Sequence, residues 1–344
     1  MTRPSEANIL LTAKKFLMHP SSDPIAGRLS CLALRHLLLL YGMFNQDVDF
    51  DVTLRIAANP SNNCQQSPDC LQEVTLLRLG FAALQLELWE DAAKAYRLYT
   101  SLEPNGFESW NNLAKAYIKL GDKKRAHKVL QEALKCNFSN WKVWENFMLV
   151  SIDTQNYEDA LNSYERLLEL KEKFIDLEVL EILTQVISEE ALDSNGNSAK
   201  RFTKKAIKLL GHACTKNVNN GHLHELSARL ELEDPLKRAQ KLQSAYRGYT
   251  QANSQWSKTA DSCGKIVQLC IELGQSSLEA FESAKDDAGK LLSVKSQLSS
   301  ARLTGQGCLK VAGNEGWEQN AALLEELRIL VERITTVLTN LINK

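Results

Sequence analysis

The chain has 344 residues, with 41 basic and 42 acidic side chains and a formal net charge of −1. This balance gives no long-range attraction to nucleic acid or to an anionic membrane, which argues against both as principal partners. The 16 glycines and 7 prolines are few for this length, which favours a helical chain.

Residues 1–70 are expected to form an N-terminal helical flank. Helices are predicted at 6–19 and 24–43, with a breaker at 20–24 between them. Leucines surround most of the 24–43 segment, so it is expected to be largely buried. The most apolar run, Leu29 to Phe44, holds Arg35 and His36 and is too short to span a bilayer. The start of the sequence lacks the apolar core of a signal peptide.

A stretch from Leu71 to Lys173 repeats itself with a period of about 34 residues, called here the repeat interval. Three sets of residues recur at this interval: Leu76, Trp110 and Trp144; Ala92, Ala126 and Ala160; Tyr96, Leu130 and Tyr164. The period and the residue types resemble the tetratricopeptide repeat, in which each unit is a pair of antiparallel helices, A and B. Three repeats are predicted, at 73–106, 107–140 and 141–174, and stacking them would bury one continuous core.

Seven repeat positions are predicted to hold these units together. Small residues are expected where two helices cross closely, and large ones where the A and B helices leave space between them. The residues are Gly80, Ala92, Trp110, Tyr117, Ala126, Trp144 and Ala160.

Part of the stretch resembles one particular family. The segments Ala114–Ile118 and Leu130–Asn137, followed by Trp141-x2-Trp144-Glu-Asn146 and Tyr164-x2-Leu167-Leu168, are similar to the tetratricopeptide repeat protein 27 family. The resemblance covers roughly residues 71–185. It implies an intracellular helical-repeat protein without catalytic residues. The family is longer, with a large region before these repeats, whereas only the flank at 1–70 precedes them here.

Residues 175–344 are predicted to form a C-terminal helical region with degenerate repeat-like hairpins, in which the repeat interval is lost. Thr304–Gly307 and Gly313–Gly316 are expected to break helices. The last helix, at about 317–342, carries apolar residues at heptad spacing from Leu324 to Leu341. Such a stripe fits either a terminal helix packed on its neighbour or a short coiled coil. The predicted fold class is thus all-α, an α-solenoid of tetratricopeptide hairpins with atypical flanking helices.

The tetratricopeptide resemblance implies that the A helices line a concave groove. Predicted partner-binding residues of this groove are Leu77, Phe81, Asn111, Asn112, Lys115, Lys142 and Asn146, and the same face includes Lys119 and Leu149. We expect a non-catalytic scaffold that binds other proteins there. The alternatives are a subunit of an RNA-processing or chaperone-linked assembly and an enzyme with an unrecognised C-terminal site.

The sequence contains no phosphate-binding loop, dinucleotide-binding fingerprint, H-E-x-x-H or G-x-S-x-G motif, so neither a catalytic residue nor a cofactor is predicted. His222 and His224 are two residues apart on a predicted helix and therefore point to different faces, which makes a poor metal pair. The eight cysteines include no C-x-x-C, which is typical of reduced thiols in the cytoplasm, with the nucleus as the alternative location. Of the five residues by which some tetratricopeptide proteins clamp a chaperone tail, only Asn112 and Lys142 match, so that clamp is not expected.

Overall fold

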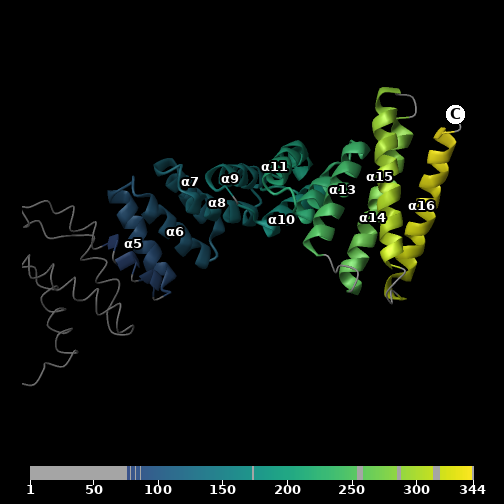
Figure 1. Ribbon diagram of the computed structural model, residues 1–344. Helices are drawn as coiled ribbons and strands as arrows, with labels where there is room; N and C mark the ends of the chain where they lie inside the picture. Colours follow the sequence, from purple (N-terminus) through teal and green to yellow (C-terminus); the bar gives the residue numbers. More distant parts are fainter. Residues whose placement is uncertain are drawn as a thin grey trace, which may run out of the picture. The chain divides into compact units, whose positions relative to one another are not determined.

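The computed structural model describes residues 76, 77, 79–81, 83–85, 87–172, 174–253, 259–284, 288–312 and 318–342. The predicted flank at 1–70 and the predicted breaker at 313–316 lie outside these residues. In the described part the regular elements are helices, with one isolated bridge between Leu192 and Ser198 (Figure 1). The chain divides into two compact units, Met1–Thr154 and Gln155–Lys344, called here the N-terminal and the C-terminal unit.

The N-terminal unit is a stack of short antiparallel helices. Its described helical residues between 76 and 85 are followed by α5 (Trp89–Leu102), α6 (Phe107–Lys119), α7 (Lys123–Cys136) and α8 (Trp141–Asp153). The helices from α5 to α8 pack consecutively, each on the next (Figure 1). Side chains of Asp122 and Asn140 accept hydrogen bonds from the first-turn backbone of α7 and α8, which fixes where those helices begin. The repeat pattern of the sequence thus corresponds to alternating A and B helices.

In the described part of the C-terminal unit, α-helices of 10 to 18 residues come first and three of 22 to 25 residues follow. They are α9 (Tyr157–Leu170), α10 (Leu177–Ser188), the 3₁₀ helix η1 (Ala199–Phe202), α11 (Thr203–Lys216), α12 (Gly221–Leu230), α13 (Pro235–Ala252), α14 (Ala260–Ser283), α15 (Ala288–Ala312), the 3₁₀ helix η3 (Glu318–Asn320) and α16 (Ala321–Ile342). In Figure 1 the long helices α14, α15 and α16 lie side by side. The predicted all-α fold class, an α-solenoid of helical hairpins, is confirmed.

The turn that follows each A helix repeats the same backbone geometry. Glu87, Gly121 and Gln155 succeed one another at the repeat interval and have φ angles of 60°, 79° and 60°. A positive φ lets the next amide reach back into the helix, as in a Schellman C-cap. Leu88 N donates to Ala83 O, and Asp122 N to Tyr117 O, both at 2.9 Å, although only one of the three positions carries the glycine this geometry favours.

The same turn recurs once more beyond the predicted repeats. Glu190 follows Gln155 at an interval one residue longer than the repeat interval and has a φ of 54°. It precedes Ala191, whose N–H donates to Val186 O at 3.0 Å. The turn ends α10, which packs on η1 and α11. The backbone geometry therefore repeats over one more helical hairpin than the sequence pattern does. That hairpin consists of α10 and α11, and residues 191–198 connect α10 to η1 and α11.

Glycine at one of these turns is expected to stabilise the protein. Gln155→Gly should raise the free energy of unfolding by about 1 kcal/mol, because a Cβ is unfavourable at positive φ. Gly121→Ala should lower it by a similar amount, and a Cβ there would meet no atom within 4 Å, so the backbone effect is isolated. Urea denaturation of both variants measures the difference. Two variants indistinguishable from the parent would contradict the assigned backbone conformation.

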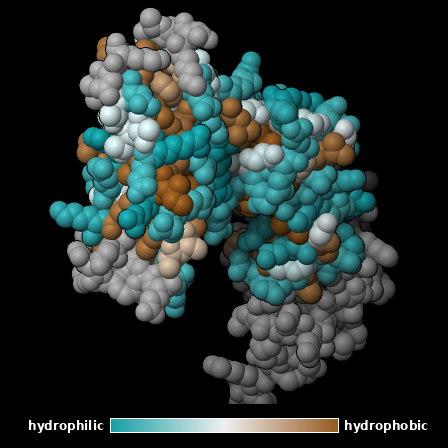
Figure 2. All heavy atoms as spheres, turned by 90° about the vertical axis from the view of Figure 1, so that its right-hand side faces the viewer, coloured by the Kyte–Doolittle hydropathy of each residue, from teal (hydrophilic) through white to brown (hydrophobic). Residues whose placement is uncertain are grey.

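The apolar stripe of the last helix faces inward. Leu327, Val331, Ile334 and Leu338 are buried in a cluster with residues of α14 and α15, among them Leu298. The stripe is thus the packing face of a helix on its neighbours rather than an exposed coiled-coil seam. Hydrophobic residues on the face drawn in Figure 2 form separate patches among hydrophilic ones. None of the helices in the described ranges is long and apolar enough to cross a membrane.

The predicted breaker at Thr304–Gly307 is wrong, because α15 runs through it without interruption. A Cβ on Gly305 would lie 2.6 Å from Cγ2 of Val331 on α16. Glycine at this position lets two helices approach closely, and the hydroxyl of Thr304 is accommodated by donating to Ser300 O at 2.9 Å. Glycine here serves packing rather than a turn, a distinction that composition alone does not reveal.

Candidate partner-binding groove

The small residues at the repeat positions are buried. Ala92, Ala126 and Ala160 are fully buried. Gly80 is also buried, and a Cβ there would lie 2.8 Å from the ring of Tyr96 on α5. Glycine at position 80 therefore gives the aromatic ring the space that a side chain would occupy.

The two tryptophans have a polar role that the pattern did not suggest. Nε1 of Trp110 donates to Pro104 O at 2.7 Å, and Nε1 of Trp144 donates to Phe138 O at 2.8 Å. The two hydrogen bonds are related by the repeat interval, so each indole ties the start of an A helix to the loop that precedes it. The ring of Phe138 also packs edge-on against Trp144, with centroids 5.0 Å apart. This contact and the hydrogen bond together stabilise the turn that precedes α8.

Tyr96 connects the first two A helices. Its ring faces Gly80, and its hydroxyl accepts a hydrogen bond from Nδ2 of Asn112 on α6 at 3.3 Å. Burial raises the pKa of Tyr96 to about 12, so the phenol stays protonated at neutral pH. The amide of Asn112, predicted to face a partner, therefore also spans two repeats within the protein.

A second amide contact connects the next pair of A helices. Nδ2 of Asn146 on α8 donates to Oδ1 of Asn111 on α6 at 2.9 Å. Each of these amides has further donor or acceptor capacity. The three predicted asparagines thus help fix the A helices to one another, and part of their polar surface is used inside the unit.

Three exposed side chains occupy the same repeat position on successive A helices. Phe81, Lys115 and Leu149 succeed one another at the repeat interval; Phe81 is 57% exposed, Leu149 is 45% exposed, and Lys115 is exposed as well. Among the described residues, none forms an ion pair with Lys115. We call these three residues the exposed row. Of the other predicted groove residues, Leu77 is half-buried and Lys142 is exposed.

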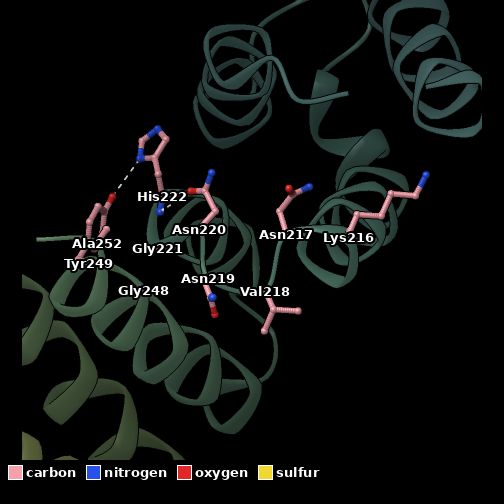
Figure 3. A pocket seen from close by; sticks show the side chains of 10 residues that line it. All are labelled: Lys216, Asn217, Val218, Asn219, Asn220, Gly221, His222, Gly248, Tyr249 and Ala252. Atoms are coloured by element: carbon pink, nitrogen blue, oxygen red, sulfur yellow. Dashed lines mark hydrogen bonds between the residues drawn. The ribbon is translucent and has the colours of Figure 1, made fainter. Parts of the chain in front are cut away.

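A separate hollow lies in the C-terminal unit, where α11 leads into α12 beside the end of α13 (Figure 3). Its volume is about 580 Å³, and its lining includes Asn217, Val218, Gly221, His222 and Tyr249. In Figure 3 the His222 and Tyr249 side chains lie together at one side, joined by a 3.1 Å contact between Nδ1 and the hydroxyl.

Beneath these two side chains, a buried carboxylate joins three helices. Glu225 on α12 accepts hydrogen bonds from Tyr249 at 2.5 Å and from Arg229 at 2.6 Å, and Lys265 of α14 lies 3.4 Å away. Burial alone would raise the pKa of Glu225, but His222, Tyr249 and the two cations outweigh it and hold the pKa well below its usual value. These contacts connect α12 to α13 and α14. Within the described ranges, no three His, Cys, Asp or Glu side chains are placed to hold a metal.

The contacts of Glu225 are expected to make the free energy of unfolding depend on pH in the acidic range. The pKa of Glu225 is lower in the folded state, so its contribution is complete above the unfolded value of about 4.3 and is lost as pH falls below it. Glu225→Gln should lower the free energy of unfolding by about 2 kcal/mol at pH 7. The free energy of unfolding of the variant should also decrease less than that of the parent between about pH 5 and pH 3, where the carboxylate becomes protonated in the unfolded state. Urea melts across that pH range measure both effects. An unchanged acid slope in the variant would refute this assignment.

Known proteins of similar sequence share the helical repeat. The tetratricopeptide repeat family model matches residues 107–140, the range predicted for the middle repeat. Tetratricopeptide repeat-containing protein trd-1 of Caenorhabditis elegans is 30% identical over 285 residues, which is 76% of this chain and 36% of that protein. The Tetratricopeptide repeat protein 27 homolog of Dictyostelium discoideum is 33% identical over 94 residues, 27% of this chain and 11% of that protein.

A solved structure, the C-terminal part of a TPR repeat-containing protein from Cytophaga hutchinsonii, is 11% identical with a TM-score of 0.41 and covers 85% of this chain and 99% of its own. Residues 107–140 match the tetratricopeptide repeat, and the chain is similar to proteins named for that repeat. Its predicted resemblance to the tetratricopeptide repeat protein 27 family is confirmed over about a quarter of its length. The chain spans about a third of the length of the nematode relative.

Proposed function

We propose that this chain is a non-catalytic intracellular scaffold, in the cytoplasm or nucleus, whose N-terminal unit binds a partner protein along the exposed row. The observation that supports this most is that Phe81, Lys115 and Leu149 recur at the repeat interval and stay exposed. Tetratricopeptide proteins generally mediate contacts between proteins, and their stacked repeats create extended concave surfaces, which supports the broad role.

The rigidity of the A helices favours binding at this surface. Contacts of Tyr96 with Gly80 and Asn112, together with the Asn111–Asn146 hydrogen bond, hold the three helices side by side. A surface ordered before binding loses less conformational entropy when a partner arrives. An exposed aromatic side chain such as Phe81 is also the kind of residue that contributes most to binding energy.

Affinity capture with the full chain tests this proposal. Phe81→Ser combined with Leu149→Ser should remove most specific partners, because both apolar contacts with the partner are lost. Both side chains are exposed, so the fold should be unaffected. Asn112 is left intact, since its hydrogen bond to Tyr96 would couple binding to stability. Capture of the same partners by parent and variant would contradict the proposal.

A matched control changes two other exposed leucines of the N-terminal unit, Leu102→Ser and Leu120→Ser, which are 42% and 40% exposed. Neither belongs to the row, so the control should retain its partners and the parent's helicity. The identity of the captured proteins would also show whether the scaffold serves an RNA-processing or a chaperone-linked assembly.

A further inference from the structure

We propose that a groove between α13 and α15 binds an acidic segment of a partner protein. The groove lies in the C-terminal unit, so the proposal does not depend on the exposed row. Its volume is about 720 Å³. Its lining includes Gln240 of α13 and Leu292, Lys295, Ser296 and Ser299 of α15, and we call it the basic groove.

The two helices that border the basic groove are fixed beside each other. The helix α14 packs on both α13 and α15, and α13 also contacts α15. Leu236 of α13 packs in one cluster with Val294 of α15, and Nε2 of Gln243 donates to Oγ1 of Thr304 at 2.9 Å. The two helices therefore run in the same direction. Gln240 lies between the two contact points on α13, so the walls of the groove are held in place on both sides of it.

Both walls of the basic groove carry positive charge. The helix α13 contains four basic residues and no acidic one, and the same is true of α15. The helix α14, which packs on both, contains four acidic residues and one basic residue. The positive charge thus belongs to the two helices that line the groove, and an anion between them meets no carboxylate on either helix.

Part of this positive charge has no counter-ion inside the protein. Within the described ranges, Arg247, Lys295 and Arg302 form no ion pair, and Nε of Arg302 is buried without a hydrogen-bond acceptor. Arg247 follows Gln240 by seven residues, and Arg302 follows Lys295 by seven. Residues seven apart lie on the same face of a helix, so both arginines share a face with a residue of the groove. Carboxylates of a partner would supply the counter-ions that these cations lack.

The carboxylates that precede the two helices in the sequence are distant from the arginines. Asp234, before α13, is paired with Lys237 at 3.1 Å. It precedes Arg247 by thirteen residues, which is about 20 Å along a helix. Asp287, before α15, lies outside the described residues, and Arg302 lies about 20 Å along the helix from the start of α15. Exposed charges are screened over about 8 Å in physiological salt, so these aspartates leave the arginines available to a partner.

An acidic protein segment fits the basic groove better than nucleic acid does. The helix α15 contains no aromatic residue, and Tyr246 and Tyr249 of α13 pack against core clusters. Surfaces that bind single-stranded nucleic acid combine cations with aromatic rings on which bases stack. The groove instead offers the hydroxyls of Ser296 and Ser299 and the side chain of Leu292, which is 79% exposed. This combination suits carboxylates together with an apolar side chain of the partner.

Binding of labelled peptides to the full chain tests the proposal. A fluorescein-labelled peptide that repeats Glu-Glu-Leu should bind about tenfold tighter than the same peptide with Gln in place of Glu, the sum of several exposed charge contacts. The difference should shrink as salt is added, because exposed charges are screened. Equal affinities of the two peptides, no binding by either, or tighter binding of a single-stranded oligonucleotide of the same charge would overturn the proposal.

Charge reversal assigns the binding to the groove. Lys295→Glu with Arg302→Glu should abolish the preference for the acidic peptide. Lys128→Glu with Lys204→Glu changes the net charge equally at exposed lysines of α7 and α11 and should keep the preference. Arg302 is half-buried, so the exposed Arg247→Glu is measured as well, with circular dichroism as the check of folding, and should weaken binding of the acidic peptide about threefold. An equal loss in the control pair, or full binding by both groove variants, would contradict the proposal.

Discussion

Gly248→Ala is expected to lower the free energy of unfolding of the C-terminal unit by about 3 kcal/mol, the upper end of ordinary overpacking costs. A Cβ at this position would lie 2.5 Å from N and 2.6 Å from Cα of Gly221. The reverse also holds, because a Cβ on Gly221 would lie 2.7 Å from N of Tyr249. These are backbone atoms, which cannot rotate away, so α12 and α13 would have to separate. Figure 3 shows the two glycines where these helices meet.

Gly211, in the same unit, is a glycine whose replacement should stabilise the protein. Gly211 lies inside α11, and a Cβ there would meet no atom within 4 Å. Gly211→Ala should therefore raise stability by about 0.5–1 kcal/mol through helix propensity alone. Thermal and urea unfolding of both variants compares them directly. Equal effects would mean that the glycine pair does not form a close helix crossing.

Ala126→Glu is expected to lower the free energy of unfolding by about 3 kcal/mol, because it forces a charge into a fully buried position on α7. The neighbouring change Lys128→Glu alters charge on the exposed face of the same helix and should stay within about 0.5 kcal/mol of the parent. Thermal unfolding followed by circular dichroism measures both. An unchanged melting temperature for Ala126→Glu would remove the basis for the repeat alignment.

The repeat could be read from the sequence because its packing depends on residue size at fixed intervals. Ala92, Ala126 and Ala160 mark buried helix crossings, and they are buried as expected. The turns could not be followed in the same way. Glu87 and Gln155 adopt the positive φ that only Gly121 indicates by its residue type. Backbone hydrogen bonds accompany that conformation, and the residue types at these positions do not indicate them.

The groove shows a similar division between what periodicity fixes and what it leaves open. The interval places Asn111, Asn112 and Asn146 on A helices, yet it does not say which neighbours their amides contact. Tyr96 lies on the B helix α5, and its hydroxyl accepts one of those hydrogen bonds, from Asn112 on α6. The repeat position of Tyr96 predicts burial but no polar contact. Hydrogen-bond pairing depends on side-chain geometry across helices, which a single sequence does not specify.

Site-specific photo-crosslinking tests the central claim most directly. A photoreactive phenylalanine analogue replaces either Leu149, on the exposed row, or Leu102, an equally exposed leucine on α5. The account predicts that a captured partner crosslinks at position 149 through one short segment, and that the crosslink at 102 is weak or absent. Strong crosslinking of that partner at 102 with none at 149 would contradict the account and move the binding surface off the A helices.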